Sequence, residues 1–148
     1  MVENDYICIN RGEVIIYMNK NRVTPTCIQS LQDHEIFVFG SNLKGMHYGG
    51  AALTAYHLYG AILGKGVGLQ GHSYAIPTMQ GGVDTIRPYV NDFIAFSILH
   101  PQLHFLVTRI GCGIAGFTSK EIAPLFIGAK KVENISLPED FWKVIGEP

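Results

Sequence analysis

Short apolar runs recur along the chain and predict strands and helices that alternate after an N-terminal hairpin. Uninterrupted apolar runs are typical of strands covered on both faces, whereas apolar residues three or four positions apart are typical of helices. The expected strands are 6–10 and 13–18 in the hairpin and then 36–39, 73–76, 103–108 and 132–137, and the expected helices are 25–32, 51–59, 84–99, 118–126 and 138–145. This alternation predicts an α/β fold, a three-layer α/β/α sandwich with a mixed central sheet, in a single domain over residues 1–148.

Glycines are concentrated in one part of the chain, since eleven of the 17 fall between Gly40 and Gly82. Glycine-rich loops follow two of the predicted strands, at 40–50 and 109–118, and the segment 64–71 contains too many glycines to be expected as regular structure. Backbone N–H groups at a helix start or in a glycine loop can bind phosphate directly. The pattern therefore predicts a crevice for an anionic ligand where these strands end.

Two segments have the glycine spacing of a dinucleotide-binding fingerprint, but neither has the required context. The segment 66–71 precedes a predicted strand instead of opening a helix. The segment 111–116 is separated from its helix by three residues, and no clearly acidic position follows about 20 residues later. A phosphate-binding turn of another kind is the better interpretation.

Five side chains are candidates for chemistry in this crevice. Asn42 follows a strand end, where its carboxamide could bind ribose hydroxyls, position a water molecule or serve turn geometry alone. His47 and His72 fall within glycine-rich loops and are the nearest candidate acids or bases. Arg109 is the natural cation for a diphosphate, and Cys112 is better interpreted as a small apolar wedge than as a reactive thiolate.

The composition excludes several classes of function. The net charge of −1 gives no general attraction to nucleic acid or to an anionic membrane. The three cysteines lack CxxC spacing, so neither a zinc site nor a disulfide framework is expected, and a reducing, cytoplasmic setting is favoured. No histidine pair has metal-binding spacing, and no metal or other cofactor is expected. No signal-peptide pattern or membrane-spanning apolar run is present, so no membrane partner is expected.

Four sequence blocks occur in the order seen in macrodomains, which bind ADP-ribose. The blocks are IFVFGSN (36–42), GG-AAL (49–53), GxG…SYAIPT (66–78) and FLVTRIGCGIAGF (105–117). The chain is similar to a set of uncharacterised bacterial and phage macrodomain-like proteins and, more distantly, to the terminal ADP-ribose protein glycohydrolase branch. The resemblance covers about residues 33–128, so the N-terminal hairpin lies outside it.

The resemblance places Asn42 in the ribose-side loop and Gly49 and Gly50 at the helix start. It places the loop from Gly111 to Phe117 around the diphosphate. Together with the loop residues named above, the expected ligand-binding residues are Gly40, Ser41, Asn42, Gly49, Gly50, Ala51, Thr78, Arg109, Gly111, Cys112, Gly113, Ile114, Ala115, Gly116 and Phe117. Phe117 would flank the distal ribose.

The sequence also departs from the family. The Asp that recognises adenine in many macrodomains has no counterpart, and Asp33 is only a remote substitute. Met79 and Ala115 stand where the glycohydrolase branch has its catalytic Lys and Asp, and neither can act as a nucleophile or base. The expected function is binding of ADP-ribose or a related nucleotide diphosphate, alone or as an ADP-ribosylated macromolecule. Hydrolysis of an ADP-ribosyl or acyl-ADP-ribose linkage, and a non-catalytic structural or regulatory role with a degenerate cleft, remain alternatives.

Overall fold

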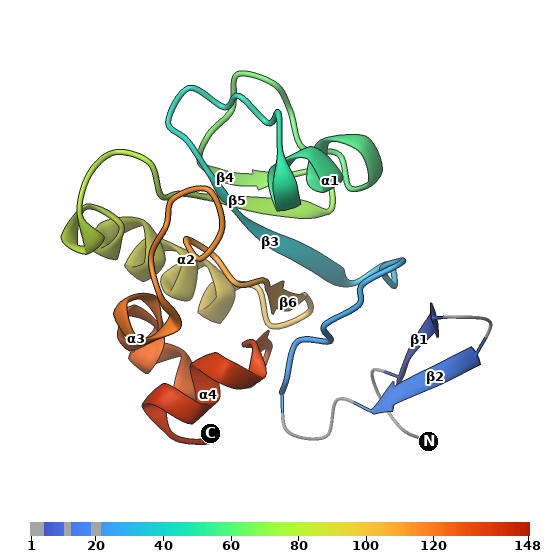
Figure 1. Cartoon of the computed structure of the whole chain (residues 1–148). Helices are drawn as coiled ribbons and strands as arrows, with labels where there is room; N and C mark the ends of the chain where they lie inside the picture. Colours follow the sequence, from blue (N-terminus) through green and yellow to red (C-terminus); the bar gives the residue numbers. More distant parts are fainter. Residues whose placement is uncertain (1–4, 11–12, 19–21) are drawn as a thin grey trace.

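The computed structural model describes residues 5–10, 13–18 and 22–148 and shows a mixed five-stranded sheet with its helices (Figure 1). Strands β1 (Asp5–Asn10) and β2 (Glu13–Met18) pair antiparallel and form a separate two-stranded sheet. The predicted hairpin is therefore confirmed for its backbone. The predicted α/β class and the mixed sheet are confirmed for the rest of the described chain.

The main sheet has the strand order β4-β5-β3-β6-β7, with β3 at its centre. The strands span Glu35–Ser41 (β3), Gly68–Gln70 (β4), Ser73–Pro77 (β5), His104–Val107 (β6) and Ile135–Ser136 (β7). β3 is parallel to both β5 and β6, β7 is parallel to β6, and β4 is antiparallel to β5. The carboxyl ends of β3, β5 and β6 therefore meet at one end of the sheet.

The helices follow the predicted positions with one change of type. They span Gly50–Leu58 (α1), Arg87–Leu99 (α2), Ser119–Ile122 (α3) and Glu139–Ile145 (α4), with 3₁₀ turns at Val83–Thr85 (η1) and Ala123–Lys131 (η2). A capping box between Thr118 and Glu121 starts α3. The chain then continues as 3₁₀ helix, since Pro124 has no N–H for an α-helical bond. None of the described helices combines the length and apolarity needed to cross a bilayer.

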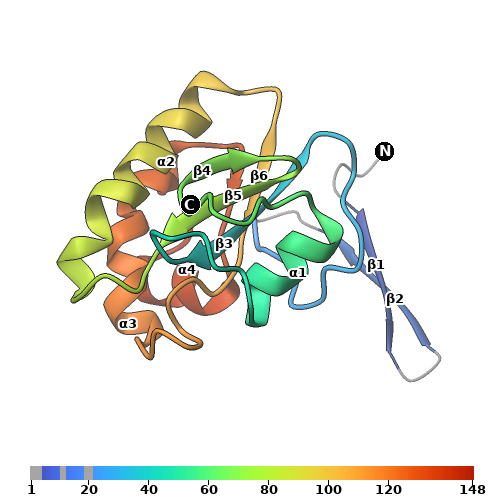
Figure 2. The ribbon, with the colours of Figure 1, turned by 90° about the horizontal axis from the view of Figure 1, so that it is seen from above.

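Side chains of β3 alternate between two hydrophobic clusters on opposite faces of the sheet. Ile36 and Val38 pack with residues of α2, η2 and α4, whereas Phe37 and Phe39 pack with α1. In the ribbon, α1 lies on one side of β3 and α2 on the other (Figure 2). All four side chains are at most 5 % exposed. Burial on both faces explains why this strand is an uninterrupted apolar run.

The predicted helix 25–32 is wrong, because this segment is irregular. Val23 forms a parallel bridge with Leu137, and the N–H of Thr24 donates to the Leu137 carbonyl at 2.8 Å. The Arg22 guanidinium donates to three carbonyls of the η2–β7 segment at 2.7–2.9 Å. These contacts with distant residues outweigh the local helix-start signal of Thr24 and the proline after it.

Two further expectations need correction. β4 forms within the glycine-rich segment 64–71, because it pairs with β5 through a tight turn in which Gly71 has a φ of +59°. Cys27 is disulfide-bonded, contrary to the expectation of reduced cysteines, whereas Cys112 is free. The side chain of Cys8 lies outside the described part of the chain.

A buried polar cluster lies at the amino end of the sheet. His104 Nε2 lies 2.7 Å from the Ser136 hydroxyl, and its Nδ1 lies 4.0 Å from the Glu35 carboxylate. Burial, with smaller contributions from His34 and Arg22, lowers the pKa of His104 to about 4. The imidazole is therefore neutral in the folded protein at pH 7.

We expect His104 to make the protein less stable as the pH falls from 6.5 to about 4. In this window the unfolded chain binds a proton that the folded protein excludes, so the free energy of unfolding decreases by up to about 1.4 kcal/mol per pH unit. Above pH 6.5 this contribution is fully present. Urea unfolding across the window measures the slope, which should be smaller in His104→Gln; an equal slope in both proteins would contradict the assignment.

Candidate functional site

The loops after β3 and β6 diverge and leave a crevice between them. After β3 the chain enters α1 on one face of the sheet, and after β6 it passes through the loop 109–118 to α3 on the other face (Figure 2). Adjacent strands whose connections diverge in this way form the usual ligand position of open α/β sheets. The two loops approach closely, because a Cβ on Gly40 would lie 3.5 Å from Gly111 N.

A cavity of about 420 Å³ occupies this crevice and is lined by both loops. It brings together most of the predicted ligand-binding residues, namely Gly40, Ser41, Asn42, Gly49, Gly50, Ala51, Thr78, Arg109, Gly111, Gly113, Ile114 and Ala115. Its lining is completed by Met46, Tyr48, Ala52, Met79, Thr108 and Ile110. Residues from four separate parts of the sequence thus surround one space.

Three of the predicted ligand-binding residues do not line this cavity. Phe117 packs against the larger hydrophobic cluster, and its N–H donates to the Gly111 carbonyl at 2.9 Å, so it closes the loop. Cys112 packs against the same cluster, and burial raises the pKa of its thiol, opposed in part by Ser119 and Arg109. That environment fits a small apolar wedge better than a reactive thiolate. Gly116 has a φ of +79° and shapes the loop.

The start of α1 presents unbonded N–H groups to the cavity. Gly49 is the N-cap and supplies no side-chain cap, and the first N–H with a backbone partner is that of Leu53, which donates to the Gly49 carbonyl at 3.2 Å. The N–H groups of Gly50, Ala51 and Ala52 have no hydrogen-bond partner among the described residues. All three residues line the cavity, so this helix start is available to an anion.

A second set of N–H groups comes from the loop after β6. Within it, the Gly116 N–H donates to the Gly113 carbonyl at 3.0 Å, and a φ of +75° at Gly111 turns the chain. Between these positions, the N–H groups of Gly113, Ile114 and Ala115 donate to no group in the described part of the chain. These three residues also line the cavity. A loop with successive free N–H groups is a typical anion-binding concavity.

The charges around the cavity favour an anion. None of the described residues that line it is acidic, and Arg109 is the cation among them. The sequence explains this asymmetry, because it contains no Asp or Glu between Glu35 and Asp84. That acid-free stretch, 36–83, includes all of β3 after Glu35 and all of α1, and it is a signal by which this wall of the crevice could have been recognised from sequence.

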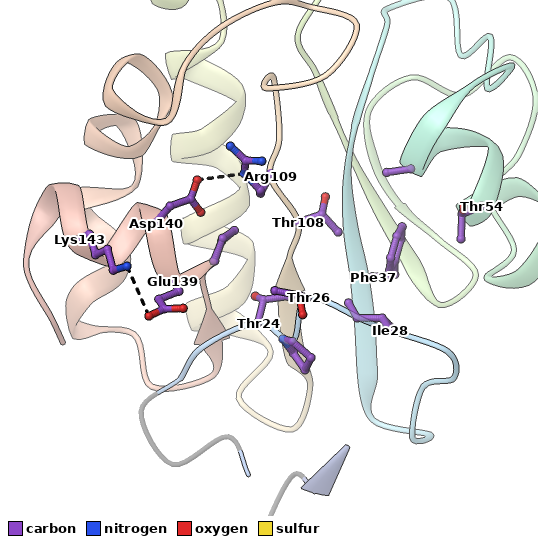
Figure 3. Close-up of a pocket in the computed structure, with 13 residues that line it drawn as sticks. Thr24, Thr26, Ile28, Phe37, Thr54, Thr108, Arg109, Glu139, Asp140 and Lys143 are labelled. Carbon is purple, nitrogen blue, oxygen red and sulfur yellow. Dashed lines mark hydrogen bonds and ion pairs between the residues drawn. The ribbon is translucent and has the colours of Figure 1, made fainter. Parts of the chain in front are cut away.

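A larger cavity of about 780 Å³ adjoins the first (Figure 3). The two share Ala51, Thr108 and Arg109 in their linings. The larger cavity is also lined by Thr24, Pro25, Thr26, Ile28, Phe37, Thr54, Pro138, Glu139, Asp140 and Lys143. No sequence pattern indicated this cavity, because its walls come from the irregular segment 24–28, which has a helix-start pattern, and from α4.

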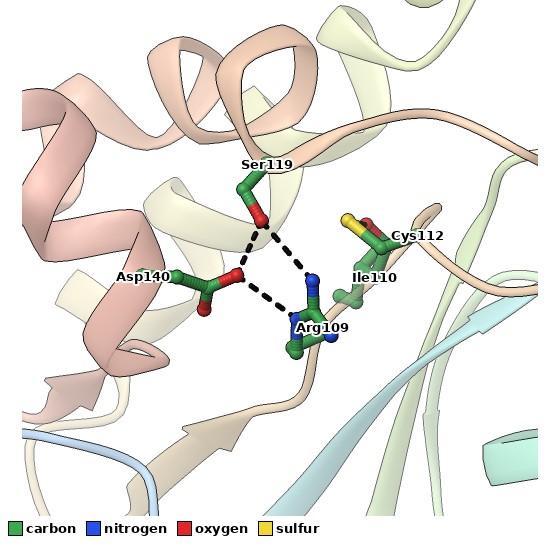
Figure 4. Close-up of polar contacts among 5 residues, drawn as sticks. All are labelled: Arg109, Ile110, Cys112, Ser119 and Asp140. Atoms are coloured by element: carbon green, nitrogen blue, oxygen red, sulfur yellow. Dashed lines mark hydrogen bonds and ion pairs between the residues drawn. The ribbon is translucent and has the colours of Figure 1, made fainter.

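Arg109 lies at the junction of the two cavities and is held by an ion pair. Its Nε donates to Asp140 Oδ2 at 2.9 Å, and its Nη2 lies 3.4 Å from the Ser119 hydroxyl (Figure 4). The Arg109 side chain is 64 % exposed, so it remains accessible from the crevice.

Asn42 and His47 act within the loop after β3. Asn42 lines the cavity. Its carboxamide forms two hydrogen bonds of 2.9 Å with the backbone of Met46, so the side chain stabilises the turn that follows β3. His47 is fully buried, and its Nε2 lies 3.0 Å from the Ile62 carbonyl and 3.1 Å from that of Lys65. The imidazole thus fastens a neighbouring loop, is absent from the cavity lining, and is no longer a candidate acid or base.

His72 is not brought to this crevice. It directly precedes β5, at the amino end of the parallel strands, and lines a separate cavity of about 320 Å³ beside Tyr59. The structure therefore separates His72 from the other predicted residues by the length of the sheet.

The crevice contains little that could perform acid or base chemistry. Met79 and Ala115 both line the smaller cavity, and neither side chain can act as a nucleophile or base. The Thr78 and Thr108 hydroxyls lie 3.4 Å and 2.8 Å from β3 carbonyls, to which they donate. The described residues also contain no cluster of metal-ligating side chains. The arrangement suits binding of an anion better than cleavage.

Comparison with known proteins gives no relative for this chain. No family model and no curated protein matches it, and no solved structure matches its fold.

Proposed function

We propose that the crevice binds ADP-ribose or a related nucleotide diphosphate. The observation that carries this proposal is the set of six free N–H groups, from 50–52 and 113–115, around one cavity without a carboxylate. N–H groups from a helix start and a glycine loop can hold a diphosphate with few cationic side chains, and here Arg109 adds one. Burial of both faces of the sheet also supports a macrodomain-like three-layer sandwich.

The larger cavity offers space for the nucleoside of such a ligand, next to the site proposed for its diphosphate. It shares Arg109 with the anion site, and its lining includes the apolar residues Ile28 and Phe37. Its wall also carries threonine hydroxyls and the carboxylate of Glu139, which can accept hydrogen bonds from sugar hydroxyls or base N–H groups. The paired cavities suit a ligand with an anionic centre and a bulkier, less charged end.

We infer a binding module in preference to a hydrolase. The side chains that line the smaller cavity include Met79 and Ala115 where a catalytic pair would be needed, and His47 and His72 are absent from the lining. Without a positioned acid or base, bound ligand should be retained rather than cleaved.

Calorimetric titration with ADP-ribose tests this function. We expect saturable binding at one site, weaker binding of ADP and no binding of adenosine, because adenosine lacks the diphosphate. No heat and no shift in melting temperature at millimolar ADP-ribose would refute the proposal. Incubation with a mono-ADP-ribosylated protein should give retention without release of ADP-ribose, and release would indicate a hydrolase instead.

A further inference from the structure

A polar network joins three elements at the base of the loop 109–118 (Figure 4). Arg109 opens the loop, Ser119 is the first residue of α3, and Asp140 lies in the first turn of α4. The Ser119 hydroxyl donates to Asp140 Oδ2, the same oxygen that accepts from Arg109 Nε at 2.9 Å. One carboxylate oxygen of α4 therefore holds both ends of the loop.

This network adds to the hydrogen bonds within the loop. Inside the loop, the N–H groups of Cys112, Gly116 and Phe117 donate to the carbonyls of Arg109, Gly113 and Gly111, respectively. At the two ends of the loop, the side chains of Arg109 and Ser119 contact each other through Nη2 and the hydroxyl at 3.4 Å, and both bind Asp140. The loop that carries the free N–H groups is thus anchored to α4.

The same contacts orient the Arg109 guanidinium. Nε and Nη2 face Asp140 and Ser119, whereas Nη1 has no hydrogen-bond partner among the described residues. Arg109 lines both cavities, and its side chain is largely exposed. A guanidinium held along one edge loses less conformational freedom when its other edge binds an anion.

We propose that Asp140 is a positioning residue for the anion site, acting through Arg109 and Ser119. The inference rests on the proposed function, in which the diphosphate lies in the smaller cavity. Asp140 does not line that cavity and lines only the larger one. Electrostatics alone predicts that removal of a negative charge near the site would strengthen anion binding, whereas positioning predicts that it would weaken it. The sign of the effect therefore separates the two accounts.

The test is the affinity of Asp140→Asn for ADP-ribose and for inorganic pyrophosphate. We expect a loss of about tenfold for both, because the guanidinium and the loop lose their anchor. Asp84→Asn is the matched control, since Asp84 forms an exposed ion pair with Arg87 at 3.2 Å and lines neither cavity. Ser119→Ala should show part of the loss, and Ser119→Thr, which keeps the hydroxyl, should restore it. In an Arg109→Gln background, Asp140→Asn should have a much smaller effect.

Unchanged or tighter binding by Asp140→Asn would overturn the inference. If the wild-type protein bound pyrophosphate but not ADP-ribose, the proposed nucleotide ligand would be refuted. The role of Asp140 would then be decided by the affinity of Asp140→Asn for pyrophosphate. Failure of the wild-type protein to bind either probe would overturn both proposals. An NMR spectrum of the arginine Nε–H groups supplies a ligand-free readout, in which the Arg109 signal should exchange faster with water in Asp140→Asn and not in Asp84→Asn.

Discussion

Replacement of Gly40 by leucine is expected to lower the affinity for ADP-ribose by at least about 100-fold. A Cβ at this position would lie 3.4 Å from Thr78 Oγ1 and 3.5 Å from Gly111 N, which are ordinary contact distances. All three residues line the smaller cavity. The remaining leucine atoms would extend into the space assigned to the diphosphate. Loss of two or more hydrogen bonds to a charged group corresponds to roughly this factor.

The variant Gly128→Leu is the control for this experiment. A Cβ on Gly128 would also make one ordinary contact, 3.5 Å from Ile94 Cδ1, but Gly128 lies in η2 and lines neither cavity. We expect both variants to keep a melting temperature within about 4 °C of the wild type. Calorimetric titration measures the affinities, and undiminished binding by Gly40→Leu would mean that the anion lies elsewhere.

Replacement of Gly66 by alanine is expected to lower the free energy of unfolding by about 3–4 kcal/mol and to weaken ligand binding. A Cβ on Gly66 would overlap the Asn42 carbonyl and lie 2.8 Å from the Leu43 carbonyl oxygen. These are backbone atoms of the loop that leads to α1, so relief of the overlap must displace that loop. The Ser41 hydroxyl, which donates to the Gly66 carbonyl, would lose its partner as well.

Gly68→Ala provides a comparison only two residues away. Gly68 has a φ of +88°, so alanine is strained there, but its Cβ would meet nothing within 4 Å. We expect a loss of about 1–2 kcal/mol in the free energy of unfolding and no change in affinity. Chemical unfolding and titration of both variants measure the difference. If Gly66→Ala and Gly68→Ala had equal stability and equal affinity, the close contact of Gly66 with Asn42 and Leu43 would not be what shapes the site.

The crevice itself could be predicted from sequence because its signals are local. Glycine loops directly after the predicted strands 36–39 and 103–108 place two flexible turns at the same end of a parallel sheet. Of the fifteen residues expected to bind ligand, from these loops and from the resemblance to macrodomains, all but Cys112, Gly116 and Phe117 line one cavity. The uninterrupted apolar run of β3 likewise followed from burial on both faces.

The larger cavity could not be predicted in the same way, because distant contacts form it. The segment 24–28 has a helix-start pattern, but pairing of Val23 with Leu137 and the bonds of Arg22 to carbonyls near residue 130 hold it in another form. No short-range pattern encodes that register. The wall contributed by α4, including Asp140, depends on the same long-range packing.

The positions of His47 and His72 relative to the crevice also depend on long-range structure. A histidine in a glycine-rich loop is usually solvent-exposed, yet His47 is fully buried against the segment 62–65, whose carbonyls it contacts. His72 lies at the opposite end of β5 from the crevice, a distinction that depends on strand direction. Proximity to glycines in sequence did not indicate proximity to the site in space.

An amide nitrogen–proton NMR titration with ADP-ribose tests directly whether the six free N–H groups bind the diphosphate. We expect the N–H signals of 50–52 and 113–115 to shift together and to saturate at one affinity, because these groups receive the diphosphate. Signals from the amino end of the sheet, near His72, should not move. Binding that leaves the six N–H signals unchanged, or no shift anywhere at millimolar ligand, would show that the diphosphate does not bind at these groups.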